Sequence, residues 1–232
     1  MTTASAVLLN GTLTTSAEAA STNSIRRAGT QDPEGRLEIS RMSTTRSGQR
    51  GPAPRAILMA GMPGAGKTTL ARAFEQAGMV RLCPDEEMFR RYGHYGRDFP
   101  RGEFRVREAP VLKDVARELQ EHLENKRDVV VDHGFWTQEE RDQWAQAARE
   151  AGGVPVLIYL PVPHEVRWDR IRERNADALV DANSIEFSEQ DLRRFAGRFH
   201  PPTTDEPHLV YDGDPAHALD ALARPLGKDE GP

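Results

Sequence analysis

The sequence has little cysteine, no long apolar run and no excess of positive charge. Its single cysteine, Cys83, permits no internal disulfide, and the reducing cytoplasm is the expected compartment. The longest apolar stretches, such as residues 154–163, are far shorter than the roughly 20 residues that span a bilayer, so we expect no membrane partner. The chain has 31 Lys and Arg against 36 Asp and Glu, a net charge of −5. This balance argues against nucleic acid as a partner.

Aromatic residues are absent from positions 1–52, which are dense in Ser, Thr, Ala, Gly and Arg. Such a composition buries too little apolar surface to offset chain entropy, so we predict a disordered N-terminal tail over 1–52. A targeting peptide and a translation start at Met42 are the alternatives. One domain is expected over 53–226, followed by a short flexible tail at 227–232.

From residue 55 onward, short apolar runs alternate with longer helical stretches, which is typical of βαβ units. The runs are apolar on both faces, as buried parallel strands are. Two capping-box patterns begin helices at about 138 and 189. A helical region over 105–125 is expected to be interrupted at Pro110, and 93–102 to form a loop. The predicted fold is α/β, an open parallel five-stranded sheet with helices on both faces and strands at 56–60, 79–82, 128–131, 154–160 and 209–211.

A phosphate-binding loop is the strongest motif. The segment from Gly61 to Thr68 fits the pattern G-x-x-x-x-G-K-[ST] and lies between an apolar strand and a helical stretch. Glycines here let successive backbone N–H groups point at phosphate oxygens, and the helix N-terminus adds positive charge. Lys67 would bridge the β- and γ-phosphates, and the Thr68 hydroxyl would ligate Mg²⁺. The predicted nucleotide-binding residues are Gly61, Met62, Pro63, Gly64, Ala65, Gly66, Lys67, Thr68 and Thr69.

Two acids follow predicted strands, at the edge of the sheet where a ligand crevice forms. After the second strand, the Asp85 carboxylate can accept the proton of an attacking hydroxyl. The alternative for Asp85 is a helix-capping role in the first turn of the next helix. After the third strand, Asp132 resembles a Walker B acid that holds Mg²⁺ or orients the acceptor, and the alternative is a turn aspartate. Next to it, His133 is expected to form a pocket wall or donate a hydrogen bond, and the alternative is an acid or base; Phe135 and Trp136 are expected to pack in the core, and the alternative is stacking on an acceptor ring.

Arginines gather in two places. Arg167, Arg170 and Arg174 share one helix face after the fourth strand, where they suit a lid that closes over the transferring phosphoryl group. The alternative is a solvated face whose arginines pair with nearby acids. Between residues 90 and 107 there are six Arg against two acids. This segment suits an anionic or hydroxyl-rich acceptor unless its arginines pair with acids of the folded body.

Together these residues resemble the AAA_33 group of P-loop kinases, small ATP-dependent phosphotransferases related to chloramphenicol phosphotransferase, zeta toxins and polynucleotide kinases. The resemblance covers about residues 55–212 and implies an α/β kinase fold, ATP with Mg²⁺, a catalytic aspartate at Asp85 and lid arginines at Arg170 and Arg174. Polynucleotide kinases place an arginine three residues beyond that aspartate, where this chain has Met88, which counts against an end-healing kinase. The motifs behind the resemblance span residues 61–69, 84–86, 132–136 with 140–142, 170–175 and 199–206.

The leading hypothesis is a kinase that transfers the γ-phosphoryl group of Mg-ATP to a hydroxyl of a small molecule such as an antibiotic, a nucleoside or a sugar. Asp85 would be the base, Lys67, Arg170 and Arg174 would complete the catalytic set, and Thr68 and Asp132 would hold the metal. One alternative is an ATP-binding regulator or assembly factor that modifies nothing. Another is an RNA or tRNA kinase, against which the acidic body argues. These patterns select neither an acceptor nor an oligomeric state.

Overall fold

The computed structural model describes residues 52–176, 185 and 187–223. The predicted tails at 1–52, apart from Pro52, and at 227–232 lie outside these residues, as does Met42. Within the described part of the chain, no helix is both long enough and apolar enough to span a membrane.

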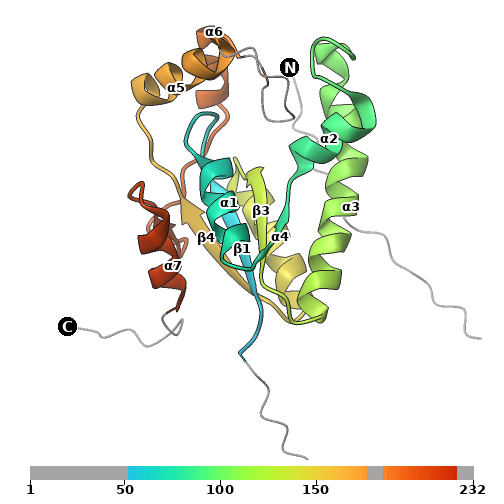
Figure 1. The fold of residues 1–232 in the computed structure, drawn as a ribbon, viewed down its shortest axis with the longest axis vertical. Helices are drawn as coiled ribbons and strands as arrows, with labels where there is room; N and C mark the ends of the chain where they lie inside the picture. Colours follow the sequence, from blue (N-terminus) through green and yellow to red (C-terminus); the bar gives the residue numbers. More distant parts are fainter. Residues whose placement is uncertain (1–51, 177–184, 186, 224–232) are drawn as a thin grey trace, which may run out of the picture. The chain divides into compact units, whose positions relative to one another are not determined.

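Five parallel strands form one open sheet in the order β2-β3-β1-β4-β5 (Figure 1). The predicted α/β fold with a five-stranded parallel sheet is therefore confirmed. The strands are β1 (Arg55–Ala60), β2 (Val80–Leu82), β3 (Val129–Gly134), β4 (Val154–Tyr159) and β5 (Leu209–Val210). The helices are α1 (Lys67–Gln76), α2 (Pro84–Tyr92), α3 (Phe104–Glu124), α4 (Gln138–Glu150), α5 (His164–Ala176), α6 (Glu189–Ala196) and α7 (Pro215–Ala223), with a 3-10 turn at Arg101–Glu103.

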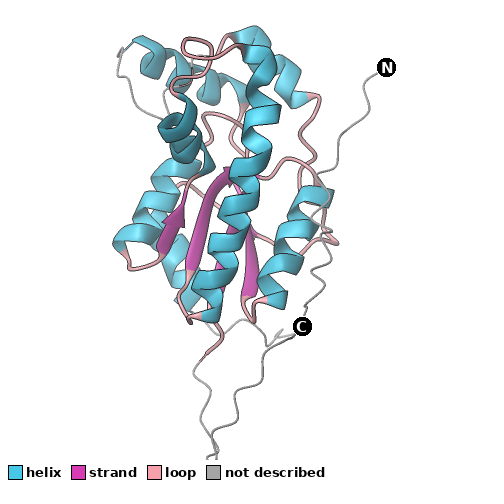
Figure 2. Ribbon diagram, turned by 90° about the vertical axis from the view of Figure 1, so that its right-hand side faces the viewer, coloured by secondary structure: helices cyan, strands magenta, loops and turns pink. Residues whose placement is uncertain are grey.

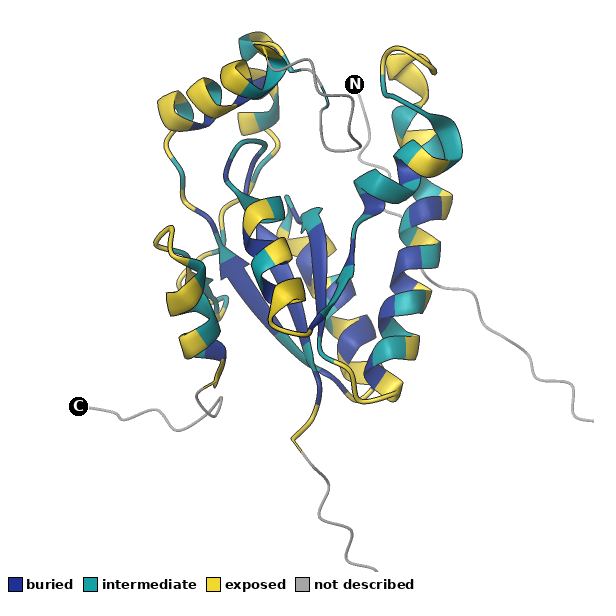
Figure 3. Ribbon diagram, in the orientation of Figure 1, coloured by how far each residue is buried: buried dark blue, intermediate teal, exposed yellow. Residues whose placement is uncertain are grey.

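Helices cover both faces of the sheet because successive side chains of a strand point to opposite sides. Along β1, Ala56 and Leu58 join the core formed with α3 and α4, whereas Ile57 and Met59 join the core formed with α1 and α7. In Figure 2 the strands lie between helices, and in Figure 3 they are the most continuously buried elements. This two-sided burial explains the continuous apolar runs in the central strands β1, β3 and β4.

The two capping boxes begin α4 and α6 as predicted. The backbone N–H of Glu140 donates to Oγ1 of Thr137 at 3.2 Å, and that of Asp191 donates to Oγ of Ser188 at 3.1 Å. The prediction of a break at Pro110 is wrong, because α3 runs through this residue. Pro110 is exposed, and the carbonyl group that loses its helical partner belongs to Val106, which is 77% exposed and can bond to water.

The end of β3 also differs from the prediction. The strand was expected to end at residue 131, but it continues to Gly134. Its pairing with β1 jumps from Leu58–Val131 to Met59–Gly134, so Asp132 and His133 lie in a bulge. A bulge redirects side chains relative to the regular pleat. Asp132 therefore belongs to the strand and is 3% exposed, which excludes the interpretation as a turn aspartate.

Candidate functional site

The phosphate-binding loop connects β1 to α1. Gly64 and Gly66 have φ values of +80° and +97°, a region that L side chains rarely adopt. A Cβ atom at Gly64 would lie 2.7 Å from the backbone oxygen of Arg167, so a larger residue would displace either the loop or the start of α5. Helix α1 begins at Lys67 without a side-chain cap, which leaves its first N–H groups free for an anion. The loop has the form of a phosphate cradle.

Lys67 provides the positive charge of this loop. Its Nζ donates to the backbone oxygens of Gly61 at 3.0 Å and Met62 at 3.2 Å. Burial lowers the pKa of Lys67, and the negative charges of Asp132 and Asp85 oppose this shift. The ammonium group thus contacts the loop and interacts electrostatically with the two acids that sequence analysis selected.

Thr68 and Asp132, the two predicted metal ligands, are adjacent. The Thr68 hydroxyl donates to Oδ1 of Asp132 at 3.2 Å. Hydroxyl and carboxylate oxygens are ligands that Mg²⁺ accepts, and kinase sites combine one or two such groups with phosphate oxygens of the nucleotide. The donor set therefore fits Mg²⁺, with Thr68 and Asp132 as the residues that would hold it.

Arg81 also contacts Asp132, and sequence analysis missed it. Its Nε and Nη2 donate to Oδ2 of Asp132 at 3.0 and 2.6 Å, and Nη2 also donates to Oε1 of Glu86 at 2.8 Å. The only sequence signal is a charged residue between Val80 and Leu82 in an otherwise apolar strand. Its partner Asp132 is 51 positions away, so no local pattern connects them.

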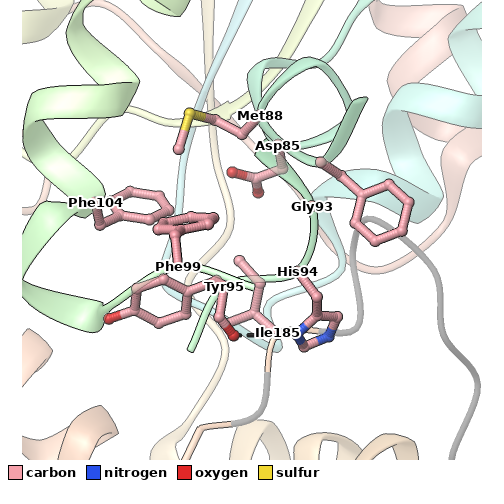
Figure 4. Close-up of a pocket in the computed structure, with 9 residues that line it drawn as sticks. Asp85, Met88, Gly93, His94, Tyr95, Phe99, Phe104 and Ile185 are labelled. Carbon is pink, nitrogen blue, oxygen red and sulfur yellow. Dashed lines mark hydrogen bonds between the residues drawn. The ribbon is translucent and has the colours of Figure 1, made fainter. Parts of the chain in front are cut away.

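Asp85 points into a small cavity formed by α2 and the segment that follows it (Figure 4). Burial, with the nearby charge of Asp132, raises the pKa of Asp85 from 3.8 to about 6. A carboxylate with this pKa is ionised at neutral pH yet basic enough to accept a proton. The cavity has a volume of about 10 Å³, so the elements around it must separate to admit an acceptor. Its wall is largely aromatic and includes Met88, Phe89, Gly93, His94, Tyr95, Phe99, Phe104 and Ile185.

Two further titratable side chains lie in this region. Burial and the charge of Asp85 raise the pKa of Glu108, on α3, to about 8. Sequence analysis missed Glu108, because only the packing of α3 places it near Asp85. Burial and the charge of Lys67 lower the pKa of His133 to about 4, so His133 is neutral at physiological pH, and its expected place in a pocket wall stays a prediction. Phe135 is 1% exposed and packs against Trp144 with ring centroids 5.3 Å apart, as expected of a core residue.

The three arginines of α5 have different environments. Nη1 of Arg170 donates to the backbone oxygen of Gly64 at 3.2 Å, which places this guanidinium on the phosphate-binding loop. Nη2 of Arg174 donates to the backbone oxygen of Ile185 at 3.0 Å, and its charge acts on both Lys67 and Asp85. Arg167 instead is 6% exposed, and its Nε donates to the backbone oxygen of Val162 at 3.0 Å. The proposed stripe therefore reduces to Arg170 and Arg174.

The arginines between residues 90 and 107 mostly pair with acids. Five of the six are in ion pairs, which leaves little uncompensated charge for an anionic acceptor. The pairs are Arg90–Glu87, Arg91–Glu87 and Arg91–Asp114, Arg97–Asp98, Arg101–Asp191 and Arg107–Glu103.

Comparison with known proteins identifies the family of this chain. A family model described as an AAA domain, AAA_33, matches residues 57–202. The chain belongs to the AAA_33 family. No sequence among the curated proteins matches it.

Two solved structures show the same fold. A candidate kinase from Chloroflexus aurantiacus has a TM-score of 0.61 and 19% identity over 74% of this chain and 98% of its own. The APS kinase of Mycobacterium tuberculosis, solved with AMPPNP and APS, has a TM-score of 0.52 and 15% identity over 75% of this chain and 100% of its own. The AAA_33 chain described here therefore has a kinase-type P-loop fold, which is a nucleotide-binding fold.

In this AAA_33 protein, the C-terminal ends of the strands bring the predicted residues together. Lys67 and Thr68 come from the loop after β1, Asp85 follows β2, and Asp132 lies at the end of β3. Arg170 and Arg174 approach from α5, which follows β4. This edge of a parallel sheet is where ligands of such folds bind.

Proposed function

We propose that this AAA_33 protein is a phosphotransferase that moves the γ-phosphoryl group of Mg-ATP to a hydroxyl of a small molecule. The observation that carries the proposal is the Asp85 carboxylate, which faces a cavity, interacts electrostatically with Lys67 of the loop and has a pKa raised to about 6. A kinase needs a group that accepts the proton of the acceptor hydroxyl or orients that hydroxyl, and Asp85 can serve as this group. A nucleotide hydrolase would orient water with the same carboxylate, but the largely aromatic lining of the cavity suits an organic acceptor better than water.

In the proposed mechanism, each residue has a defined role. The backbone N–H groups of the loop and the Lys67 ammonium bind the phosphates, and Arg170 and Arg174 stabilise the charge that spreads over the transferring group. The oxygen of the acceptor hydroxyl bonds to the γ-phosphorus while the bond from that phosphorus to ADP breaks, and Asp85 accepts the proton that the hydroxyl loses. Thr68 and Asp132 would hold Mg²⁺, which neutralises phosphate charge when bound.

The lining of the cavity favours one class of acceptor. Aromatic side chains and Met88 surround Asp85, a surface suited to the apolar face of a small alcohol rather than to a polyanion. The paired arginines of residues 90–107 also argue against RNA, because a neutralised segment offers few phosphate contacts. We therefore favour a small hydroxyl compound, with antibiotics, nucleosides and sugars as the first candidates.

An acceptor screen tests the proposal. The protein is incubated with Mg-ATP and a library of hydroxyl compounds, and products are read by mass for the gain of one phosphoryl group. We expect a product with the wild type and none with Asp85→Asn, although calorimetry should find nucleotide binding in both. Asp220→Asn, the same change at an exposed position of α7, serves as the control and should keep full turnover.

The other outcomes identify the alternatives. Unchanged turnover by Asp85→Asn would contradict the role of this residue. Nucleotide-dependent capture of a protein without any phosphorylated product would favour the regulator. Binding of RNA that weakens steeply with salt would favour an RNA kinase.

A further inference from the structure

Arg81 lies where three elements of the site meet. It is the central residue of β2, and its side chain is 6% exposed. Its guanidinium donates twice to Oδ2 of Asp132 in the bulge of β3, and once to Oε1 of Glu86 in the first turn of α2. One buried side chain therefore joins the end of β3 to the helix that carries Asp85.

Both oxygens of Asp132 consequently have partners within the protein. Oδ2 receives the two N–H groups of Arg81, and Oδ1 accepts the Thr68 hydroxyl at 3.2 Å. Two N–H groups of one guanidinium hold Oδ2 while the Thr68 hydroxyl contacts Oδ1, so the three bonds together orient the carboxylate, and a lysine lacks the fork of donors that holds Oδ2. The contact with Arg81 thus determines which oxygen of Asp132 faces Thr68.

The second contact of Arg81 acts on the acceptor side. Glu86 follows Asp85 directly, and both belong to the first turn of α2. The contact between Nη2 of Arg81 and Oε1 of Glu86, at 2.8 Å, holds this turn against the bulge of β3. It thereby limits where the Asp85 carboxylate can lie relative to the loop.

We infer that Arg81 is a positioning residue, which holds Asp132 on Thr68 and the first turn of α2 in one arrangement suited to phosphoryl transfer. The inference rests on the function proposed above. A purely structural role explains the pair poorly, because apolar residues of similar volume often replace a buried ion pair without loss of stability. Groups that orient the ligands of a metal, by contrast, typically change metal affinity or activity about 10- to 100-fold when they are altered.

A second buried pair provides a matched control. The side chain of Arg141 is 3% exposed, and its Nε and Nη2 donate to the two carboxylate oxygens of Glu206 at 2.6 and 2.7 Å. Arg141 also donates to the backbone oxygen of His200, so it ties α4 to the segment after α6. Arg81→Lys and Arg141→Lys therefore each remove a buried guanidinium that donates two hydrogen bonds to one carboxylate, one inside the proposed network and one outside it.

The experiment compares these two variants with the wild type. Calorimetry measures the affinity for ADP at increasing Mg²⁺, and thermal unfolding verifies that each variant folds. We expect Arg81→Lys to bind ADP without Mg²⁺ within about twofold of wild type, and to require about 10-fold more Mg²⁺ for half of the metal-dependent gain in affinity. With an acceptor from the screen, kcat should fall about 10- to 100-fold while the acceptor KM stays within about twofold.

Arg141→Lys should lower the unfolding temperature but leave the Mg²⁺ requirement and kcat near wild type. If Arg81→Lys behaves in the same way, Arg81 is structural and the inference is wrong. Should Arg81→Lys not fold, Glu86→Gln takes its place, since Glu86 is 42% exposed and its loss leaves Asp132 paired. We expect a lower kcat with an unchanged Mg²⁺ requirement, and an unchanged kcat would overturn the link to α2. If the wild type yields no phosphorylated product, the proposed function fails, and the Mg²⁺ dependence of ADP binding still decides the role of Arg81.

Discussion

Replacing Asp85 with Asn should make the protein more stable while it removes activity. Asp85 lies in the first turn of α2, half-buried beside a cavity and near Asp132, and this environment raises its pKa from 3.8 to about 6. The folded state therefore disfavours the ionised carboxylate that the proposed mechanism needs. Asparagine has nearly the same shape and carries no charge, so the variant removes this unfavourable term.

The size of the stability gain follows from the pKa of Asp85. Since one pKa unit is about 1.4 kcal/mol, a shift from 3.8 to about 6 means that ionised Asp85 costs about 3 kcal/mol in the folded state. Removing a negative charge from the first turn of α2 also loses about 0.3–1 kcal/mol of favourable interaction with the helix dipole. Because the side chain is only half-buried and water reduces the cost, we expect a net gain of about 1–2 kcal/mol at pH 7.5.

The raised pKa of Asp85 also determines how this stability gain changes with pH. The folded pKa of Asp85 lies above the unfolded value, so the unfavourable term is complete above about pH 6 and disappears as the pH falls toward 4. Urea unfolding of both proteins at several pH values measures the difference. We expect Asp85→Asn to be more stable at pH 7.5 and equal to the wild type near pH 4.

Glu87 offers a control in the same helical turn. Its hydrogen bonds with Arg90 and Arg91 hold its pKa below the ordinary value, so its ionised form stabilises the fold. Glu87→Gln should therefore destabilise the protein by about 0.5–1 kcal/mol at pH 7.5, the opposite sign. If Asp85→Asn is no more stable than the wild type at pH 7.5, or if its gain is the same at both pH values, burial of an ionised Asp85 is refuted.

Three other predictions concern the loop, the base and a buried pair. Below about pH 6 the kcat/KM of the wild type for the acceptor should fall about 10-fold per pH unit as Asp85 becomes protonated, and a kcat/KM that is flat down to pH 4.5 would exclude it as the base. Gly64→Ala should weaken nucleotide binding in calorimetry about 10- to 100-fold because of its φ of +80° and the contact with Arg167, whereas Gly102→Ala, whose Cβ would meet nothing within 4 Å, should bind normally. Arg141→Met should lower the free energy of unfolding in urea by about 3–5 kcal/mol because it leaves a buried carboxylate unpaired, and a loss below about 1 kcal/mol would contradict this.

Much of the fold could be predicted because its signals are local. Each central strand is buried on both faces, so β1 and β3 appear as continuous apolar runs, and the capping boxes at Thr137 and Ser188 mark helix starts within a few residues. The loop from Gly61 to Thr68 is local as well, since the glycines and Lys67 that form it are consecutive. These features depend on neighbours in sequence, which is why the sequence was sufficient to find them.

The errors occurred where packing or pairing decides the structure. The bulge in β3 depends on the register with β1, which carries Met59 opposite Gly134, and the sequence of β3 alone does not show it. The continuity of α3 through Pro110 depends on the exposure of the carbonyl of Val106 to water. Arg167 fits the helical stripe by spacing, but the contact of α5 with the loop buries it.

Arg81 shows how such an error affects chemistry as well as shape. With Asp132 considered alone, both carboxylate oxygens are free to bind a metal, and a Walker B role follows from the apolar run before it. The structure shows that Arg81 holds one oxygen and Thr68 contacts the other, so the carboxylate is already oriented before any ligand binds. Because Asp132 is already oriented, it loses less conformational entropy when nucleotide and metal bind. This arrangement favours accurate placement of the phosphates rather than tight binding of the metal by protein groups alone. A residue such as Arg81, which orients a predicted metal-ligating side chain, is therefore found only when the pairing of the neighbouring strands is known.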